Sequence, residues 1–186
     1  NLDEAALNIG GTGKNLSLKA GEEYWYAFTA DETNYYTFYT TGATGATYAS
    51  LYDSMSANDS IGEEWGYNDF RLETQLRKGD TVYLRTTAPN AVEGTPVTAA
   101  LKVSKRGAGQ TALTLGENGF DITLTQGEEK WYSFTADQAN CYTFYTENAT
   151  GTVAVELYNS LKGSRFASQT GNDDFSYAVS LDAGKT

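Results

Sequence analysis

Apolar and polar residues alternate in several short stretches of the chain, separated by Gly, Asn and Asp. These stretches are "YWYAFTA" from Tyr24, "YTFYTT" from Tyr36, "TYASLYD" from Thr47, "FRLETQL" from Phe70 and "TVYLRTT" from Thr81. Alternation with period two in segments rich in Thr, Tyr and Val predicts β-strands with one face turned towards a core. Helical periodicity extends no further than about two turns anywhere in the chain. We therefore expect an all-β fold of short antiparallel strands.

The pattern occurs twice. "GEEYWYAFTADETNYYTFYT", residues 21–40, returns as "GEEKWYSFTADQANCYTFYT", residues 127–146, with 15 of 20 positions identical. The offset is 106 residues up to Ser54 and 105 residues from "NDFRLETQLRKGDT" onwards, which matches "DDFSYAVSLDAGKT". This repeat predicts two tandem antiparallel β-sandwich domains of jelly-roll or immunoglobulin-like type, residues 1–106 and 107–186, with a linker near Ser104–Ala112.

Copy two is predicted to be incomplete on its C-terminal side. After Thr81, copy one continues as "VYLRTTAPNAVEGTPVTAALKVSK", two further predicted strands that copy two lacks. Three interpretations stay open. The boundary is artificial, proteolytic or followed by a disordered tail; another chain donates a strand to the unpaired edges; or copy two folds with fewer strands.

Comparison of the copies indicates which side chains face the core. Tyr26 and Phe28 return as Tyr132 and Phe134, and in the next strand Tyr36 and Phe38 return as Tyr142 and Phe144. We expect these residues to point inward, together with Ala49 and Leu51 and their counterparts Val155 and Leu157.

Strand alternation then turns a second set of aromatic residues outward. The set comprises Trp25, Tyr39 and Tyr52 in copy one and Trp131, Tyr145 and Tyr158 in copy two. If the strands are neighbours, each sandwich carries an aromatic strip. Two interpretations remain: the strip is a platform on which sugar rings stack, or it is covered by the N-terminal segment or by the other copy.

The segment "SANDSIGEEWGYND" has no close counterpart in copy two, which reads "KGSRFASQTGND". We interpret it as a polar loop that displays Trp65 and Tyr67 near Glu63, Glu64, Asn68 and Asp69. An aromatic ring that stacks on a pyranose, next to carboxylates and amides that bind hydroxyl groups, is typical of a carbohydrate site. The alternative is that these rings fold back onto the sheet.

Several acidic residues at predicted strand ends raise the question of calcium. Asp53 and Asp69 in copy one, and Asp173 and Asp174 in copy two, would contribute oxygen ligands if they met at one end of a sandwich. Calcium needs six to eight such ligands, and Asn and Asp at strand ends commonly cap turns. No cofactor is required by the pattern, and calcium is kept as a possible ligand.

Charge and composition exclude several functions. The formal net charge of -11 opposes binding to nucleic acid or anionic lipid, and no stretch approaches the length of a membrane span. The chain has no histidine, and the repeated Glu22–Glu23 pair sits in a turn, where adjacent carboxylates are badly placed to flank a glycosidic bond. We therefore expect no enzymatic activity. Cys141 is the only cysteine, so the chain forms no internal disulfide.

The order of the motifs resembles a known family. A Gly-led turn, "WYSFTA", "YTFYT", "LYDS" or "LYNS" and "L.KGDTVYLR" together resemble the bacterial pre-peptidase C-terminal family of β-sandwich modules. The resemblance covers nearly all of copy one and most of copy two. It implies a non-catalytic, extracellular module, secreted or attached to the bacterial cell surface, and possible relatives in starch-adherence assemblies.

Three functions follow as hypotheses. The first is a carbohydrate-binding or adhesion module that holds a polysaccharide such as starch through exposed aromatic side chains. The second is a spacer or stalk of a cell-surface protein. The third is an assembly subunit whose second repeat accepts a strand from another cell-surface chain.

Overall fold

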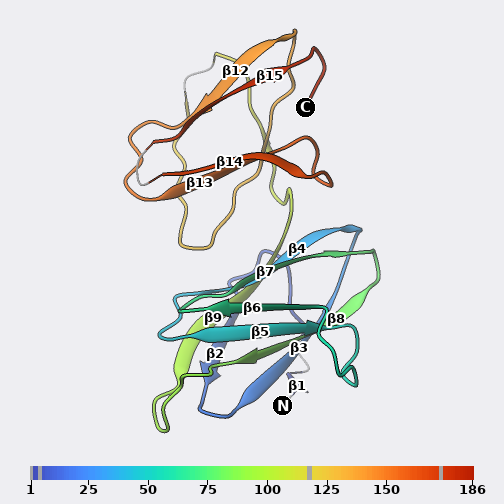
Figure 1. The fold of residues 1–186 in the computed structure, drawn as a ribbon, viewed down its shortest axis with the longest axis vertical. Coiled ribbons are helices and arrows are strands. Elements are labelled where there is room, and N and C mark those ends of the chain that lie inside the picture. Colours follow the sequence, from blue (N-terminus) through green and yellow to red (C-terminus); the bar gives the residue numbers. More distant parts are fainter. Residues whose placement is uncertain (1, 4–5, 117–118, 172–173) are drawn as a thin grey trace. The chain divides into compact units, whose positions relative to one another are not determined.

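The chain is all-β. The computed structural model describes residues 2–3, 6–116, 119–171 and 174–186, and its regular elements in these ranges are β-strands (Figure 1). The chain divides into two compact units. Unit 1 contains Asn1–Ala108 and Ile122–Glu129, and unit 2 contains Gly109–Asp121 and Lys130–Thr186. The two tandem sandwich domains with a boundary at 106/107 stay a prediction.

Unit 1 contains two sheets. The first has the strand order β1 (Leu2–Asp3), β3 (Glu23–Thr29), β8 (Thr81–Thr87), β5 (Thr47–Tyr52) and β6 (Gly62–Gly66). The second has the order β2 (Lys14–Leu18), β9 (Val97–Lys105), β4 (Asn34–Thr41) and β7 (Arg71–Leu76). All of these pairs are antiparallel except β1–β3. The five stretches of alternating residues quoted above all form strands, as predicted.

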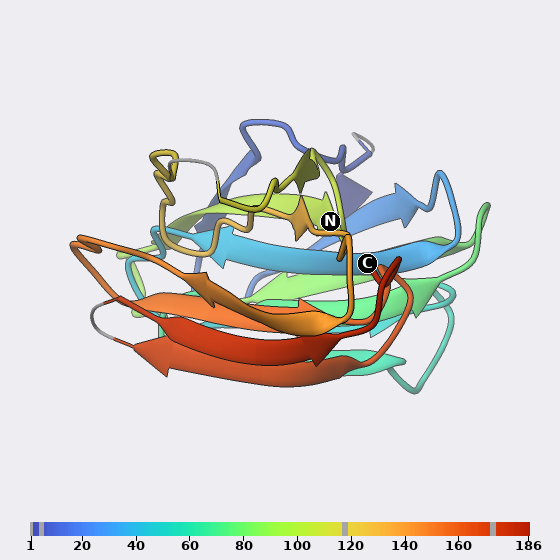
Figure 2. The ribbon, with the colours of Figure 1, turned by 90° about the horizontal axis from the view of Figure 1, so that it is seen from above.

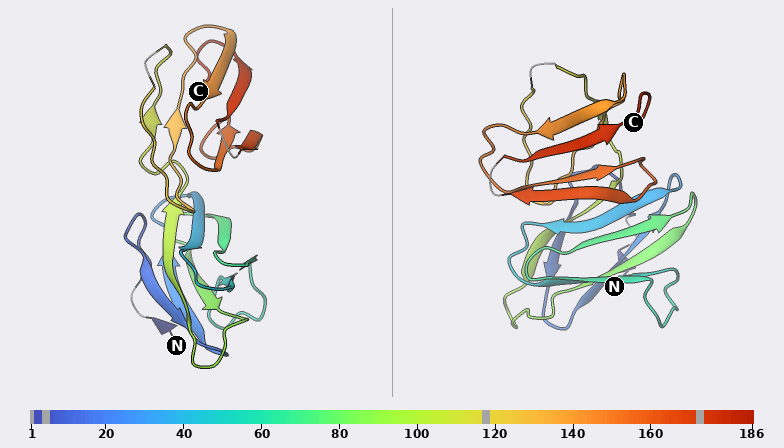
Figure 3. Two further views of the ribbon diagram at one scale, coloured as in Figure 1. Left: turned by 90° about the vertical axis from the view of Figure 1, so that its left-hand side faces the viewer. Right: turned by 45° about the horizontal axis from the view of Figure 1, so that its top comes forward.

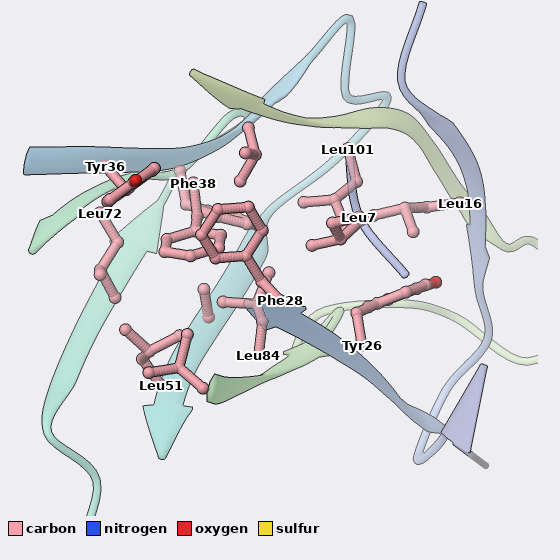
Figure 4. Close-up of a cluster of buried hydrophobic side chains, with 14 of the residues drawn as sticks. Leu7, Leu16, Tyr26, Phe28, Tyr36, Phe38, Leu51, Leu72, Leu84 and Leu101 are labelled. Carbon is pink, nitrogen blue, oxygen red and sulfur yellow. The ribbon is translucent and has the colours of Figure 1, made fainter. Parts of the chain in front are cut away.

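The inner faces of both sheets share one hydrophobic core, which gives unit 1 a sandwich-like architecture (Figure 4). Phe28 of the first sheet lies 5.3 Å from Phe38 of the second, edge to face, and 5.1 Å from Tyr36. Leu51 and Leu84 close the core on the side of the first sheet, and both are fully buried. The predicted inward positions of copy one are therefore confirmed.

A polar network closes one end of this core. The hydroxyl group of Tyr36 donates to the Asp31 carboxylate at 2.7 Å, and Lys105 Nζ lies 2.8 Å from the same carboxylate and 2.9 Å from Glu32. The Lys105 ammonium, together with the Tyr36 hydroxyl, holds the pKa of Asp31 below its usual value. Contacts with Lys105 likewise lower the pKa of Glu32. The network ties the loop after β3 to the end of β9.

The predicted linker begins too early. Ser104 and Lys105 belong to β9, and Arg106, one residue further, is buried. Arg106 donates its backbone N–H to the Tyr35 carbonyl at 2.9 Å, and its guanidinium lies 3.9 Å above the Tyr35 ring. Since these contacts belong to the sheet of β4 and β9, the first part of Ser104–Ala112 is part of unit 1's second sheet.

Unit 2 contains three separate strand pairs (Figures 2 and 3). The antiparallel pairs are β12 (Asn140–Tyr145) with β15 (Ser176–Leu181), and β13 (Val153–Tyr158) with β14 (Arg165–Gly171). The third pair is short and parallel, β10 (Thr111–Ala112) with β11 (Tyr132–Ser133). The described residues between β10 and β11 form no strand.

Unit 2 reproduces the internal geometry of unit 1 at equivalent positions. Phe134 lies 5.5 Å from Phe144, edge to face, and 4.9 Å from Tyr142. Tyr142 donates its hydroxyl group to Asp137 at 2.8 Å, as Tyr36 does to Asp31. Burial differs, however, because Tyr142 is buried whereas Phe134 and Phe144 are only half-buried.

The unequal burial of equivalent residues predicts unequal stability effects. Phe38→Ala removes a fully buried ring and should cost about 3–5 kcal/mol of unfolding free energy. Phe144→Ala should cost clearly less, because its ring is already partly exposed to water. Urea unfolding, followed by tryptophan fluorescence for each variant, measures both losses. An equal or larger loss for Phe144→Ala would contradict the burial described for the two units.

The Asp31–Lys105 contact predicts a dependence on pH. The folded pKa of Asp31 lies below its usual value of 3.8, so its stabilising contribution is complete above that pH and is lost as pH falls through the folded pKa. Lys105→Met should therefore lower stability near neutral pH, by about 1 kcal/mol or less because the pair is partly exposed. It should also flatten the loss of stability below pH 4, roughly the usual Asp pKa. Unfolding free energies measured between neutral and acidic pH test both effects, and parallel curves for the two proteins would refute the assignment.

Candidate functional site

Aromatic side chains gather on the outer face of the five-stranded sheet in unit 1. The rings of Trp25 on β3 and Tyr52 on β5 lie 5.1 Å apart with a tilt of 40°. The Arg85 guanidinium, on β8 between these strands, lies 5.9 Å from the Tyr52 ring. The Trp25 indole N–H donates to Glu23 at 3.2 Å, and Arg85 Nη1 lies 3.4 Å from the other oxygen of that carboxylate. Two of the residues expected to form the outward strip are thus in contact.

A second aromatic pair lies on the same face, between β5 and β6. Tyr48 is half-buried and Trp65 is 46% exposed, with their ring centroids 6.3 Å apart. Ser60 donates its hydroxyl group to Glu63 at 2.7 Å. Hydrogen bonds from Tyr48 and Ser60 lower the pKa of Glu63, so its carboxylate is held in the ionised form. Burial, and then the hydrogen bond to Glu63, raise the pKa of Tyr48.

Strand order explains how the two pairs come to share one face. Residues paired across antiparallel strands point to the same side of the sheet. One row across β6, β5, β8 and β3 is Trp65, Tyr48, Thr87 and Glu23. The next row is Glu63, Ser50, Arg85 and Trp25. With adjacent strands spaced about 4.8 Å apart, the four strands present a surface roughly 15 Å wide.

We call this surface the outer aromatic face. Its members are Trp25, Tyr48, Tyr52, Trp65 and Tyr83, with the polar groups of Glu23, Ser50, Glu63 and Arg85 among them. Trp65 is exposed, Trp25, Tyr48 and Tyr83 are half-buried, and Tyr52 is buried at 8% exposure. Exposed rings beside one cation and two carboxylates are able to stack on apolar faces of a ligand and to exchange hydrogen bonds with its hydroxyl groups.

The divergent segment of copy one is not a loop throughout, contrary to our expectation. Gly62–Gly66 forms β6, which pairs with β5, so Trp65 is held on a strand (Figure 1). A Cβ atom on Gly66 would collide with the backbone of Asp69, so the tight turn after β6 requires glycine. Tyr67 lies in this turn, directly after β6, and is 90% exposed.

Glu64 and Asn68, two of the polar residues predicted near Trp65 and Tyr67, do not lie on the outer aromatic face. Glu64 pairs with inward-facing Ala49, so it points to the opposite side of the sheet from Trp65. Asn68 is exposed in the turn, and its backbone carbonyl accepts a hydrogen bond from the Thr47 hydroxyl at 2.5 Å. The structure therefore places Glu63, rather than Glu64, on the same side of the sheet as Trp65.

Tyr39 does not belong to the outer aromatic face. It lies on β4, in the other sheet of unit 1, and is 9% exposed. Gly127, in the Ile122–Glu129 segment of unit 1, comes so close that a Cβ atom there would lie 3.3 Å from the Tyr39 ring. Burial, and then the nearby Glu129 and Glu128 carboxylates, raise the pKa of Tyr39. The Tyr39 ring is therefore covered by another segment and is not part of an exposed stacking platform.

Unit 2 repeats one aromatic pair and lacks the other. Trp131 and Tyr158 lie 5.3 Å apart with a tilt of 42°, as Trp25 and Tyr52 do. The positions equivalent to Tyr48 and Trp65 hold Ala154 and Thr170. Tyr145, the equivalent of Tyr39, is 61% exposed. The Tyr48–Trp65 pair is therefore a property of copy one.

The predicted calcium ligands are not brought together. Asp53 follows the end of β5 and Asp69 follows the end of β6. Since these strands are antiparallel, the two carboxylates lie at opposite ends of the pair, about 17–20 Å apart for strands of this length. In the part of the chain that the structure describes, no three acidic, histidine or cysteine side chains are grouped to hold a metal ion.

Two of these acids instead hold turns. Asp69 accepts the backbone N–H of Ala43 at 3.0 Å. Asp174 accepts the backbone N–H groups of Asn148 and Ala149 at 2.9 and 2.8 Å, and Asn148 has a positive φ of 61°. The remaining predicted ligand, Asp173, lies outside the described residues.

Sequence reasoning missed Tyr48, Tyr83 and Arg85 as members of the outer aromatic face, whereas Glu63 was expected near Trp65. The sequence did contain the information, because each of these residues lies one position from an inward-facing residue of a predicted strand and must point outward. What was lacking was the strand order, which places β8 between β3 and β5 although these strands are far apart in the sequence.

Comparison with known proteins does not narrow the function further. No protein-family model and no curated protein matches the chain. The resemblance to pre-peptidase C-terminal modules therefore stays a prediction. The described residues include no helix long and apolar enough to cross a membrane.

The placement of Trp65 predicts its accessibility in solution. At 46% exposure, against half-buried Trp25 and Trp131, it should be the tryptophan most readily quenched by acrylamide. Trp65→Phe should therefore lower the quenching constant of the remaining emission, whereas Trp25→Phe should not. Equal effects of the two substitutions would mean that Trp65 is covered.

Proposed function

We propose that this protein is a non-catalytic extracellular carbohydrate-binding module that binds a polysaccharide through the outer aromatic face of unit 1. The observation that carries the proposal is the Tyr48–Trp65 pair beside Glu63. Trp65 is 46% exposed and Tyr48 is half-buried, and the pair lies on the face that also carries Trp25 and Tyr52. Polysaccharide chains offer both apolar ring faces and hydroxyl groups, which match this combination of side chains.

Comparison of the two copies indicates which aromatic pairs the repeated fold accounts for and which it does not. Trp25–Tyr52 and Trp131–Tyr158 have the same separation and tilt, so packing of the sheet explains their presence in both units. Packing demands of the repeated fold do not explain Trp65 and Tyr48, because Thr170 and Ala154 occupy the same positions in unit 2. A function specific to copy one accounts for them, and we assign ligand contact principally to Trp65, Tyr48 and Tyr67.

The charge of the protein suits an uncharged ligand. A formal net charge of -11 repels anionic polymers but leaves binding to a neutral glycan such as starch unaffected. Arg85 and Glu63 then supply hydrogen-bond donors and acceptors next to the rings. Calcium has no role in this proposal.

The proposal predicts that Trp65 determines retention on an insoluble polysaccharide. The native protein should be retained on starch or on cellulose, which are uncharged, with mucin as a control polymer. Trp65→Ala should weaken retention at least about tenfold, which corresponds to about 1.4 kcal/mol of binding free energy. Depletion of the protein from solution at increasing polymer concentration gives the affinity.

Phe166→Ala is the matched control, because Phe166 is an aromatic residue of unit 2 with a similar exposure of 49%. Its retention should equal that of the native protein. Absence of retention on every polymer, or an equal loss for Trp65→Ala and Phe166→Ala, would rule out a stacking site on the outer aromatic face and favour the spacer function.

A further inference from the structure

The outer aromatic face contains two groups of side chains with the same composition. We call Trp25, Tyr52 and Glu23 the first corner, and Trp65, Tyr48 and Glu63 the second corner. Each consists of one tryptophan, one tyrosine and one glutamate, and the ring centroids lie 5.1 Å apart in the first corner and 6.3 Å apart in the second. The first corner spans β3 and β5, on either side of β8, and the second spans β5 and β6 (Figure 1).

The first corner binds a cation that the protein itself supplies. Arg85, on the strand between the two rings, places its guanidinium 5.9 Å from the Tyr52 ring and its Nη1 3.4 Å from Glu23. The Trp25 indole N–H donates to the same carboxylate at 3.2 Å. The face of an aromatic ring attracts a cation, and an adjacent carboxylate adds a direct ionic contact. A positive group is thus held on this sheet by one ring pair and one glutamate.

The second corner has the same three kinds of side chain but a different source of contacts. Among the described residues, no lysine or arginine lies over Tyr48 or Trp65 in the way that Arg85 lies over the first corner. Glu63 accepts hydrogen bonds from two uncharged groups, the hydroxyls of Tyr48 and Ser60. Because Trp65 and Glu63 are exposed, a ligand can reach both the ring and the charge.

Arg85 leaves the negative charge of the second corner largely uncompensated. Its guanidinium pairs with Glu23, and Ser50 on β5 lies between Arg85 and Glu63 in their cross-strand row. The hydrogen bonds from Tyr48 and Ser60 lower the pKa of Glu63 more than Arg85 does. Since those two hydroxyl groups are neutral, the carboxylate keeps its full charge for a positive group of a ligand.

All three members of the second corner are specific to copy one. The pairing of β13 with β14 places Ala154, Thr170 and Ser168 at the corresponding positions of unit 2. The first corner, by contrast, is repeated as Trp131, Tyr158 and Glu129. Because the members of the second corner are replaced together, a shared role accounts for them better than the packing of the repeated fold does.

We propose that the second corner binds the protonated amino group of an amino sugar, so that the polysaccharide preferred by unit 1 carries free amino groups. The pyranose ring stacks on Trp65, and its ammonium group donates hydrogen bonds to Glu63 beside the Tyr48 ring. This inference rests on the proposed carbohydrate-binding function and names the chemical class of the sugar.

The geometry allows one ammonium group to contact both rings and the carboxylate. Cation–π attraction extends to about 6 Å from a ring centroid. Since the centroids of Tyr48 and Trp65 are 6.3 Å apart, a single group between them lies within this limit of both. Glu63 is two residues from Trp65 on β6 and points to the same side of the sheet, roughly 6.6 Å further along the strand.

Charge favours an amino sugar over a neutral one. Hydrogen bonds between an ammonium group and a carboxylate are roughly twice as strong as those between neutral groups. The formal net charge of -11 also attracts a cationic polymer and speeds its association. A neutral glycan of the same backbone retains the stacking on Trp65 and therefore binds, but more weakly. An N-acetylated amino sugar has lost its charge and should behave like the neutral glycan.

The test compares three oligosaccharides of equal length and equal β-1,4 linkage that differ only in the substituent at C2. Their units are glucosamine with a free amino group, N-acetylglucosamine and glucose. Calorimetric titration of the complete chain, at a mildly acidic pH at which the amino groups are protonated, gives the three affinities. The free-amine oligosaccharide should bind at least about tenfold more tightly than the other two, as expected for a hydrogen bond between charged groups.

Two substitutions on β6 locate the effect. Glu63→Gln removes the charge of the second corner and keeps a hydrogen-bond acceptor, so it should abolish the preference for the free amine. Glu64→Gln is the matched control, because it removes the same charge one residue further along, on the opposite side of the sheet. This variant should keep the preference. Both side chains are exposed, so neither substitution disturbs the core.

Three results would overturn the inference while leaving the proposed function in place. One is an affinity for the free-amine oligosaccharide no higher than for the other two, with retention on a neutral polymer still dependent on Trp65. Another is an equal loss of preference in Glu63→Gln and Glu64→Gln, which would assign the attraction to the net charge of the protein. The third is equally tight, Glu63-dependent binding of a lysine peptide of the same charge, which would show that the corner accepts any ammonium group. Absence of binding to every glycan, neutral or amino, would instead refute the proposed function itself.

Discussion

The backbone hydrogen bonds of two central strands are the constraint on which the rest of unit 1 depends. β8 and β9 pair on both sides, and so each joins the two halves of its sheet. Their inner side chains complete the burial of Phe28 and Phe38, and their outer side chains include Arg85. The core and the outer aromatic face therefore both depend on these two strands.

In unit 2 the aromatic contacts persist without equivalents of β8 and β9 among the described residues, but the side chains are less buried. Ring geometry thus arises from local packing, whereas exclusion of water requires the central strands.

Much of this architecture was predictable from the sequence. Alternation identified β3, β4, β5, β7 and β8, and agreement between the copies identified Tyr26, Phe28, Tyr36 and Phe38 as inward-facing. β6 escaped prediction because "GEEWG" has low intrinsic strand propensity. Its pairing with β5 overrides that preference, as tertiary context commonly does for strands.

Features that depend on strand order were predicted less well. Alternation states which face a residue occupies within its own strand but not which strands are neighbours. Tyr39 was therefore grouped with Trp25 and Tyr52, although it lies in the other sheet. For the same reason the sequence left open whether Asp53 and Asp69 meet, and the antiparallel pairing of β5 and β6 places them at opposite ends.

The inner and outer faces of these strands are under different constraints, because inward side chains must fill the core and outward side chains need not. On β5, inward Leu51 is retained as Leu157 between the copies, while outward Tyr48 is replaced by Ala154. Successive residues of one strand can thus diverge at independent rates after a duplication, since neither face contacts the other. A module built in this way can acquire a new surface specificity in one copy while its fold is inherited unchanged.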